Sequence, residues 1–282
     1  MRLRWDWLEP VIHAPYVPTL GPVAPGALAA GIFDDVIAVS GTGRFLPYDK
    51  DRRWSDHKSE SVIADEITHS PATTVIPTLS TTGRGLIKIH HYGDSQPDLA
   101  TLTACGRELC ARYGAAQHRV TWCQRTPGGA RGRLMLKTLT DHDNGEPWAG
   151  MDLTASPYAA TFPAFAQRAR QNGFMFLHQQ MQAGHDDGPV LVSIDDDRVV
   201  GALGPLATLT DRDGVRFQPP QYFAVDPAYQ GRGHGRALWR ASMSWGHANG
   251  AAYKVLQAAS GSPAEQLYLS EGLQTLGFIC AA

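Results

Sequence analysis

The chain has 282 residues, of which 43% are hydrophobic and 18% are charged, and its formal net charge is −2 at pH 7. This length predicts about two globular domains, each large enough to bury a hydrophobic core. The small net charge gives no reason to expect a nucleic-acid partner. No segment approaches the roughly 20 consecutive apolar residues of a membrane-spanning helix, so no membrane partner is expected either.

The N-terminus and the cysteines indicate a cytoplasmic protein. Residues Met1–Trp7 carry charges where a signal peptide needs a continuous apolar segment. The four cysteines lack C-x-x-C spacing, which fits reduced and mostly buried thiols. Residues 141–143 and 185–187 contain His and Asp side chains, but neither run has a partner at a known spacing, so we expect no metal. The excess of arginine over lysine is typical of GC-rich bacterial genomes.

The N-terminal half predicts an α/β domain over residues 1–128. Prolines at positions 10, 15, 18, 22 and 25 disfavour regular structure at the start of the chain. Apolar patterning and capping residues then predict a strand at Val36–Val39, a helix near Ser61–Thr68, a strand at Gly85–His90, a helix that starts at Ser95–Asp98 and ends at Gly114, and a strand at His118–Cys123. The order strand, helix, strand occurs again at 221–257. It fits either a degenerate copy of the C-terminal fold or an unrelated α/β domain.

The C-terminal domain is expected to span residues 129–282. Thr126–Gly132 has the proline and glycine content of a linker. Beyond it the pattern predicts a strand at Leu134–Leu139, a helix over Phe162–Met181 that breaks at Gly173, and strands at Val190–Ile194 and Val199–Leu206. The acidic run Asp195–Asp197 between the last two strands is interpreted as a solvated turn rather than as a carboxylate site.

A strand, a glycine-rich turn and a helix follow one another between residues 221 and 250. Tyr222–Val225 is a short run of aromatic and β-branched residues that stops before Pro227. Glycines alternate at 231, 233 and 235, and apolar residues then recur at helical spacing up to Gly250. The helix dipole is positive where the glycines leave N–H groups uncovered. The stretch therefore predicts a site for a phosphate or pyrophosphate group.

The spacing of the glycines narrows the choice of ligand. It does not fit the G-x-G-x-x-G turn of dinucleotide folds, and no Lys-Ser or Lys-Thr pair follows as in a P-loop. The pattern is Val225-x-Pro227-x-x-Gln230-Gly231-x-Gly233-x-Gly235. It resembles the coenzyme A loop of the GNAT acyltransferase superfamily and matches that loop at every defined position. The alternative is a glycine-rich turn that only joins a strand to a helix.

A later segment carries the same resemblance. A strand is predicted at Tyr253–Gln257, and Ser262 and Glu265 then form a capping box that starts a helix ending at Gly272. The spacing is Ala264-x-x-Leu267-Tyr268-x-x-x-Gly272-Leu273, which is similar to the A-x-x-(L/F)-Y-x-x-x-G-F segment of GNAT proteins. One position departs from the family, because Gly261 stands where an asparagine often contacts the coenzyme.

The resemblance implies both a fold and a reaction. It implies an α/β protein with a mixed sheet, in which the C-terminal domain has the GNAT fold and a second α/β domain precedes it. It also implies direct transfer of an acetyl group from the co-substrate acetyl-CoA to the amine of a small molecule. The coenzyme contacts that it implies are Phe223, Ala224, Val225, Gln230, Gly231, Arg232, Gly233, His234, Gly235 and Arg236. In this scheme the Phe223 or Ala224 N–H polarises the thioester oxygen.

The same resemblance implies that Tyr268 is the general acid that protonates the departing CoA thiolate. No general base is identified, because Gln221 and Tyr222 stand where the family usually has a glutamate; Asp226, His178 and a bound water are the candidates. A Ser-His-Asp hydrolase is not supported, since no G-x-S-x-G motif is present. The alternative function is a non-catalytic CoA-binding module that acts as a sensor or interaction partner.

The C-terminus predicts an open sheet edge. Leu273–Ala282 has room for one final strand, where GNAT proteins generally carry two. An unpaired edge invites aggregation. We therefore expect the N-terminal domain, or the second subunit of a homodimer, to cover this edge.

Overall fold

The structure is a computed structural model that describes most of the chain beyond residue 60. The described residues are 16–17, 21–22, 60–69, 73–81, 83–93, 96–124, 126–143, 151–185, 188–210 and 214–282. They form two compact units. Unit 1 contains the described residues up to Leu136 together with Val255–Ala282, and unit 2 contains the described residues of 137–210 and 214–254. The strand expected at Val36–Val39 and most of residues 1–30 lie outside the described residues.

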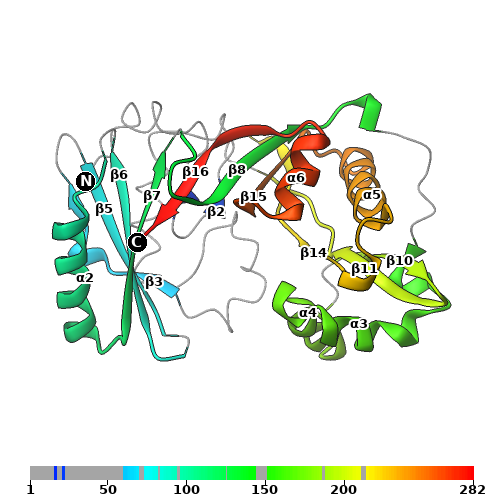
Figure 1. The fold of residues 1–282 in the computed structure, drawn as a ribbon, viewed down its shortest axis with the longest axis horizontal. Coiled ribbons are helices and arrows are strands. Elements are labelled where there is room, and N and C mark those ends of the chain that lie inside the picture. Colours follow the sequence, from blue (N-terminus) through cyan, green and yellow to red (C-terminus); the bar gives the residue numbers. More distant parts are fainter. Residues whose placement is uncertain are drawn as a thin grey trace. The chain divides into compact units, whose positions relative to one another are not determined.

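A mixed sheet with one long helix on its face forms unit 1 (Figure 1). The strand order is β15, β8, β16, β7, β6, β5 and β3, and β4 also pairs with β5. The bounds are β3 Glu60–Val62, β4 Thr68–His69, β5 Thr73–Ser80, β6 Leu86–Gly93, β7 Gln117–Gln124, β8 Ala130–Thr138, β15 Tyr253–Ala259 and β16 Gln274–Ala281. Strands β8 and β15 each run from one unit into the other. A separate pair is formed by β1, Tyr16–Val17, and β2, Gly21–Pro22.

Helix α2, Leu99–Tyr113, covers one face of this sheet. Its side chains Leu102 and Leu109 pack into a buried cluster with Ile87 and Ile89 of β6 and Val120 of β7. Successive side chains of a strand point to opposite faces. The residues between these buried positions therefore form the face of the sheet that α2 does not cover.

The final strand of the chain is covered by the N-terminal half. Strand β16 lies between β7 and β8 and is antiparallel to both. The expectation that the N-terminal half covers this edge is confirmed, because β7 comes from that half. The same pairing makes the compact units cut across the expected domains 1–128 and 129–282, since residues 255–282 group with the N-terminal half.

Unit 2 contains one small antiparallel sheet, the strands β12 and β13, and three α-helices among its described residues. The small sheet has the order β14, β11, β10, β9, while β12 pairs with β13 and β13 pairs in parallel with β15, at the end of the ten-stranded sheet. The strand bounds are β9 Met151–Asp152, β10 Leu191–Asp195, β11 Arg198–Gly204, β12 Leu209–Thr210, β13 Arg216–Gln218 and β14 Tyr222–Val225. The helices are α3 Phe162–Arg168, α4 Phe174–Gln182 and α5 His234–Ala248, and α5 packs on β10 and β11. The expected mixed α/β class is confirmed.

Short 3-10 turns connect several of these elements. They are η4 Ala64–Glu66, η5 Asp141–Asp143, η6 Leu153–Ala155, η7 Ala159–Thr161, η8 Arg170–Asn172 and η9 Pro227–Tyr229. The break expected at Gly173 is confirmed, because this residue has φ 85° and separates η8 from α4. A left-handed backbone at that position ends one helix before the next begins.

Helix α6, Pro263–Ser270, belongs to unit 1 and starts as the sequence predicts. The Ser262 Oγ accepts a hydrogen bond from the Glu265 N–H at 3.2 Å. The Glu265 carboxylate accepts from the Gly261 N–H at 2.6 Å and pairs with Arg133 Nε at 2.5 Å. The carboxylate half of the capping box is thus completed by Gly261, one residue before the N-cap.

Two local predictions are wrong. The segment near Ser61–Thr68 is not helical but forms β3, η4 and β4, because Val62 and Ile63 are buried and both strands pair with β5. These tertiary contacts outweigh local helix preference. The linker expected at Thr126–Gly132 ends earlier, since β8 starts at Ala130. A Cβ at Gly132 would lie 2.6 Å from Gln257 Nε2, so this glycine allows a close approach in the sheet.

Candidate functional site

The turn between β14 and α5 presents uncapped backbone N–H groups. After η9 the chain passes through Gly231 and Gly233, which have left-handed φ values of 78° and 92°. Helix α5 then begins at His234, and no side chain caps its first turn. A Cβ on either glycine would meet no atom within 4 Å, so the space beside the turn is open. Such a helix start can hold a phosphate group.

The strand before the turn lies at the edge of its sheet. Among the described residues, β14 is the last strand in the order and pairs with β11. The Asp226 N–H donates to the Val200 oxygen at 2.8 Å, so by the alternation of an antiparallel ladder the Ala224 amide also faces β11. The amides of Phe223 and Val225 face the outer edge. Of the two amides proposed to polarise a thioester, this register favours Phe223 over Ala224.

Gln230 fixes the turn against this strand. Its Nε2 donates to the Val225 oxygen at 3.1 Å. Further along, Gly235 and Arg236 occupy the first turn of α5, and the Arg236 side chain is exposed. The loop residues that are expected to contact the coenzyme therefore lie around the uncapped N-terminus of α5.

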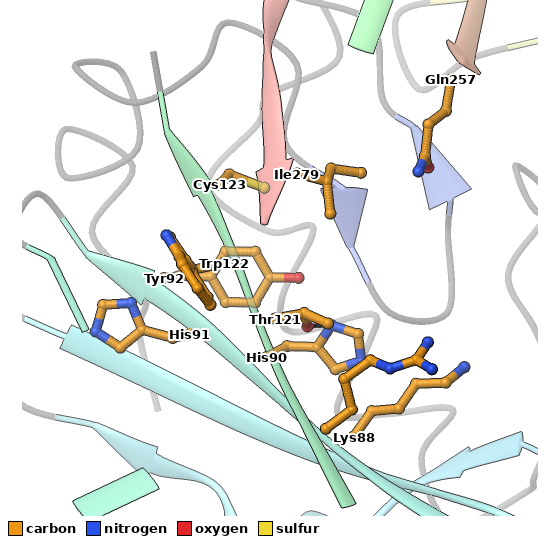
Figure 2. A pocket seen from close by; sticks show the side chains of 10 residues that line it. Lys88, His90, His91, Tyr92, Thr121, Trp122, Cys123, Gln257 and Ile279 are labelled. Atoms are coloured by element: carbon orange, nitrogen blue, oxygen red, sulfur yellow. Dashed lines mark hydrogen bonds between the residues drawn. The ribbon is translucent and has the colours of Figure 1, made fainter. Parts of the chain in front are cut away.

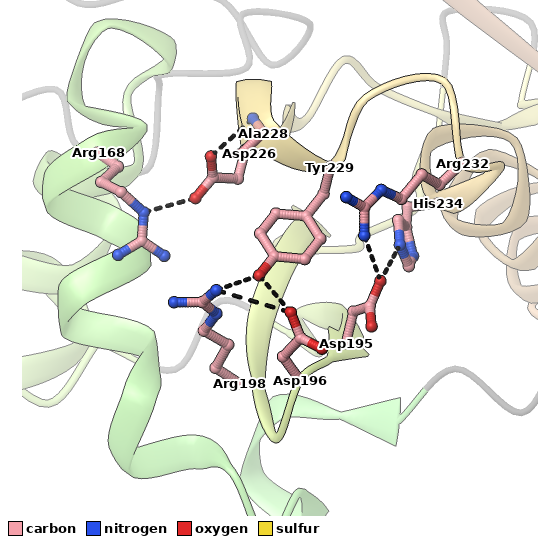
Figure 3. A network of polar contacts seen from close by, with 9 residues as sticks. All are labelled: Arg168, Asp195, Asp196, Arg198, Asp226, Ala228, Tyr229, Arg232 and His234. Carbon is pink, nitrogen blue, oxygen red and sulfur yellow. Dashed lines mark hydrogen bonds and ion pairs between the residues drawn. The ribbon is translucent and has the colours of Figure 1, made fainter.

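Asp195 connects the glycine turn to the hairpin of β10 and β11 (Figure 3). Its Oδ2 lies 3.2 Å from His234 Nε2 and 3.5 Å from Arg232 Nη1. The expected polar turn is present, because residues 196 and 197 have φ values of 48° and 54°. Asp195, however, is more than part of a solvated turn, since its carboxylate helps to position two residues of the glycine loop.

Tyr229 forms a second part of this network (Figure 3). The Cζ atoms of Arg198 and Arg232 lie 5.2 and 4.8 Å from the centroid of its ring. The Tyr229 hydroxyl accepts from Arg198 and donates to Asp196 Oδ2, the latter at 2.8 Å. Arg232 is therefore held by a ring and a carboxylate beside the turn, where its charge raises the local positive potential.

Ser193, His234 and Asp195 have the residue types of a hydrolase triad. His234 Nδ1 lies 2.7 Å from Ser193 Oγ, and His234 Nε2 faces Asp195. Ser193 is only 7% exposed, so its hydroxyl is not presented to a substrate. The imidazole instead anchors the first residue of α5.

A buried lysine marks the point where strand pairing changes. The parallel pairing of β13 with β15 ends at Gln218 and Lys254, and the chain then crosses Pro219 and joins β11 as β14. Lys254 is 1% exposed, and its Nζ donates to the Pro219 oxygen at 3.0 Å and to Gln221 Oε1. Burial lowers the pKa of Lys254 well below its usual range. No carboxylate within the described ranges pairs with it.

Gln221, which contacts Lys254, has a buried hydrogen-bond donor without a partner among the described residues. Its Oε1 accepts from Lys254, while its Nε2 is buried without a hydrogen-bond partner in the described part of the chain. Buried polar atoms are nearly always paired, so this donor calls for an acceptor. Gln221 stands two residues before Phe223. Sequence reasoning missed the Lys254 contacts, and the only signal was a lysine inside the apolar run Tyr253–Leu256.

Asp226 and His178, the candidate general bases, each contact another side chain. Asp226 accepts from the Ala228 N–H at 3.2 Å and pairs with Arg168 Nε at 2.6 Å, so its carboxylate is already used (Figure 3). His178 lies on α4, where its ring meets the Phe162 ring edge-on at 5.8 Å between centroids. Neither arrangement assigns a base.

Tyr268 is a buried residue of α6. It is 8% exposed, and burial raises the pKa of its hydroxyl. A raised pKa keeps the hydroxyl protonated at neutral pH, as a proton donor requires. The same burial is also typical of a packing residue.

Unit 2 has a pocket of about 500 Å³ at one end of its antiparallel sheet. Its lining includes Asp152, Thr154, Leu177, Met181, Val190 and Pro205. Pro205 follows Gly204, whose register partner is Tyr222 at the start of β14. The glycine turn follows the other end of β14, so the pocket and the turn lie at opposite ends of this strand.

The described residues contain neither a cluster of potential metal ligands nor a helix that could span a membrane. No group of three or more His, Cys, Asp or Glu side chains there could hold a metal ion. None of the helices in these ranges has the length and apolar character needed to cross a bilayer.

Comparison with known protein families identifies the region around the glycine turn. Residues 186–274 match the model of the acetyltransferase (GNAT) domain. This region contains β10, β11, β14, the glycine turn, α5, β15 and α6. The matched region lies within the C-terminal half of the chain and covers about a third of its length. No curated protein matches the chain.

Solved structures with similar folds include several acetyltransferases. A GCN5-related N-acetyltransferase from Sphaerobacter thermophilus is 15% identical, with 77% of this chain and 81% of that one covered and a TM-score of 0.45. A tandem GNAT protein from the clavulanic acid biosynthesis pathway is 13% identical, with 89% and 94% covered and a TM-score of 0.47. A GNAT-family acetyltransferase from Colwellia psychrerythraea is 9% identical, with 88% and 94% covered and a TM-score of 0.48. At these values the likenesses assign no role to single residues.

Proposed function

We propose that this chain is an acyl-CoA-dependent N-acyltransferase that transfers an acetyl group from acetyl-CoA to the amine of a small molecule. The observation that carries the proposal is the uncapped glycine turn, Gly231–Arg236, at the end of an edge strand. The GNAT domain match at 186–274 supports it. We propose that the acetyltransferase domain extends over residues 129–282.

Two features of unit 2 fit a bound coenzyme. The N–H groups of Gly231–Arg236 can bind the pyrophosphate, because they are uncapped and open space adjoins them. The outward amides of Phe223 and Val225 can pair with the amide-bearing arm as an added strand would.

The transfer makes one bond and breaks one. The amine nitrogen attacks the thioester carbonyl, the carbon–nitrogen bond forms, the carbon–sulfur bond breaks, and the leaving thiolate takes up a proton. The Phe223 N–H stabilises the negative charge that develops on the carbonyl oxygen. Tyr268 is the proposed donor of the proton to the thiolate. A water molecule takes the proton from the amine, since the Asp226 carboxylate is used by Arg168.

The acceptor is proposed to bind in the 500 Å³ pocket of unit 2. Leu177 and Met181 give this pocket an apolar wall, which suits the carbon skeleton of a small amine. Asp152 contributes a carboxylate whose Oδ1 accepts from the Thr154 N–H and hydroxyl. Such a lining favours an acceptor that joins an apolar body to one cationic group.

A thiol-release assay tests this function. The full chain is incubated with acetyl-CoA, a panel of amines and a thiol reagent, and an enzyme releases CoA thiol only when an acceptor amine is present. The second candidate, a non-catalytic CoA-binding sensor or interaction module, is favoured by the engagement of Asp226, which leaves no carboxylate base assigned. Binding of acetyl-CoA without thiol release would favour that module. A chain that does not bind acetyl-CoA contradicts both functions. The cytoplasmic location and the homodimer stay predictions.

A further inference from the structure

Unit 1 contains a pocket on the face of its sheet that α2 does not cover (Figure 2). Its lining includes Lys88, His90 and Tyr92 from β6 and Arg119, Thr121 and Cys123 from β7. These positions alternate with Ile87, Ile89 and Val120, which pack under α2. The pocket has a volume of about 170 Å³. A cavity of about 150 Å³ holds a benzene molecule, so this one has room for a group the size of one ring.

Two cationic residues lie opposite one another in this pocket. Lys88 and Arg119 are register partners in the parallel pair of β6 and β7. Side chains of such partners are about 5 Å apart at Cβ, and like charges at that distance destabilise a sheet. Arg119 makes no hydrogen bond or ion pair within the described residues, and none of the described residues that line the pocket is acidic. The charge of Arg119 is therefore not neutralised by the described residues.

The floor of the pocket is polar and fixed. His90 Nδ1 lies 2.9 Å from the Thr121 hydroxyl (Figure 2). His90 Nε2 lies 3.5 Å from the Thr78 hydroxyl. His90 is 6% exposed, so both ring nitrogens are held by buried or half-buried partners. Gln257 of β15 adds a side-chain amide to the lining and Ile279 of β16 an apolar contact. The pocket thus combines positive charge, fixed hydrogen-bonding groups and a small apolar surface.

We propose that this pocket binds a small organic or inorganic oxyanion, a carboxylate or phosphate group on a molecule no larger than about one ring. The planar guanidinium of Arg119 can bind two oxygens of such a group at once, and Lys88 adds a second positive charge. Thr121 pairs with His90 two positions further along these strands, on the same face of the sheet as Lys88 and Arg119. This site lies in unit 1 and is independent of the proposed transferase chemistry.

Calorimetric titration of the full chain at low ionic strength tests the proposal. Benzoate probes the carboxylate class, and inorganic phosphate probes the phosphate class. Binding of either anion is expected, and Arg119→Gln is expected to weaken it at least tenfold. The matched control is Arg107→Gln, because Arg107 is an exposed residue of α2 in the same unit and outside the pocket. Its removal changes the net charge equally and should leave the affinity unchanged.

Each possible binding result either supports or overturns the proposed oxyanion site. Binding of benzoate alone, of phosphate alone or of both supports the site and assigns its ligand class, provided that only Arg119→Gln weakens it. Equal weakening by both variants overturns the proposal, because it shows a response to net charge only. Absence of binding for both anions to the wild type also overturns it. Circular dichroism of both variants, each altered at an exposed side chain, checks that they are folded.

Discussion

Two strand–helix–strand segments of this chain differ in whether their two strands pair with each other. In the first, β6 and β7 pair in parallel from Leu86–Gln117 to His91–Trp122. In the second, the strand before the helix, β14, pairs with β11, while β15 takes β13 as its parallel partner. The first segment is closed by its own hydrogen bonds. The second leaves the outer edge of β14 available to an extended ligand.

The helices of the two segments, α2 and α5, also differ in whether a side chain caps their N-terminus. The Asp98 carboxylate caps α2 by accepting from the Ala100 and Thr101 N–H groups, and its pKa is lowered by these hydrogen bonds with the Thr101 hydroxyl contributing most. No side chain caps α5, which begins after Gly233. A protein can therefore use one local order of elements for structure or for binding, depending on whether the helix start is filled from within.

The largest expected effect concerns Tyr268, the proposed proton donor of the transfer reaction. Tyr268→Phe removes only the hydroxyl, so turnover should fall about 100-fold while the affinity for acetyl-CoA stays nearly the same. Steady-state kinetics with an amine found by thiol release measures it. Tyr253→Phe is the control, because Tyr253 is also buried and stacks on Phe217 at 5.3 Å between ring centroids. Full turnover of Tyr268→Phe would leave Tyr268 a packing residue.

Lys254 sharpens the comparison, because it stands where parallel pairing stops in the second segment. Its folded pKa lies below the unfolded value of about 10.4, so between these values the unfolded chain binds more protons. The free energy of unfolding of the wild type should then rise with pH relative to Lys254→Met, by at most about 1.4 kcal/mol per pH unit. Urea unfolding at pH 7 and pH 9 measures the difference.

The control for this titration is Lys137→Met. Lys137 lies in the same unit, and its Nζ pairs with Asp143 Oδ1 at 3.0 Å. The free energy of unfolding of the wild type relative to Lys137→Met should therefore not rise between pH 7 and pH 9. A difference between wild type and Lys254→Met that does not change with pH would show that Lys254 stays charged when buried.

The smallest expected effect concerns the closed segment. Asp98→Ala removes the cap of α2 and should slightly lower the free energy of unfolding. Acetyl-CoA affinity should be unaffected, since the cap belongs to the other segment. Denaturant unfolding and calorimetry on the same sample measure both quantities. A loss of coenzyme affinity in this variant would mean that the two segments are not independent.

The sequence predicts those features that depend on neighbouring residues. The cap at Ser262, the break at Gly173 and the turn after Val225 follow from side-chain and backbone preferences within a few positions. The helix expected near Ser61–Thr68 fails because pairing with β5 comes from residues beyond that window.

The site residues divide in the same way. The loop pattern locates the uncapped turn, whereas the choice between the Phe223 and Ala224 amides needs the register of β14 on β11. The burial of Lys254 against Gln221 depends on where two distant strands part, and no spacing in the sequence encodes it. Asp195 reaches the loop for the same reason, through the hairpin of β10 and β11.

The most direct test of the open helix start is the affinity of Gly233→Val for acetyl-CoA, measured by calorimetry. A β-branched side chain at φ 92° strains the turn and blocks the approach of a phosphate to its N–H groups. The control is Gly214→Val, because Gly214 has φ 79° and similarly open surroundings but lies outside the loop. We expect Gly233→Val to lose at least tenfold in affinity, about 1.4 kcal/mol, and Gly214→Val to bind as the wild type does. Unchanged affinity of a folded Gly233→Val would contradict the assignment of the coenzyme to this turn.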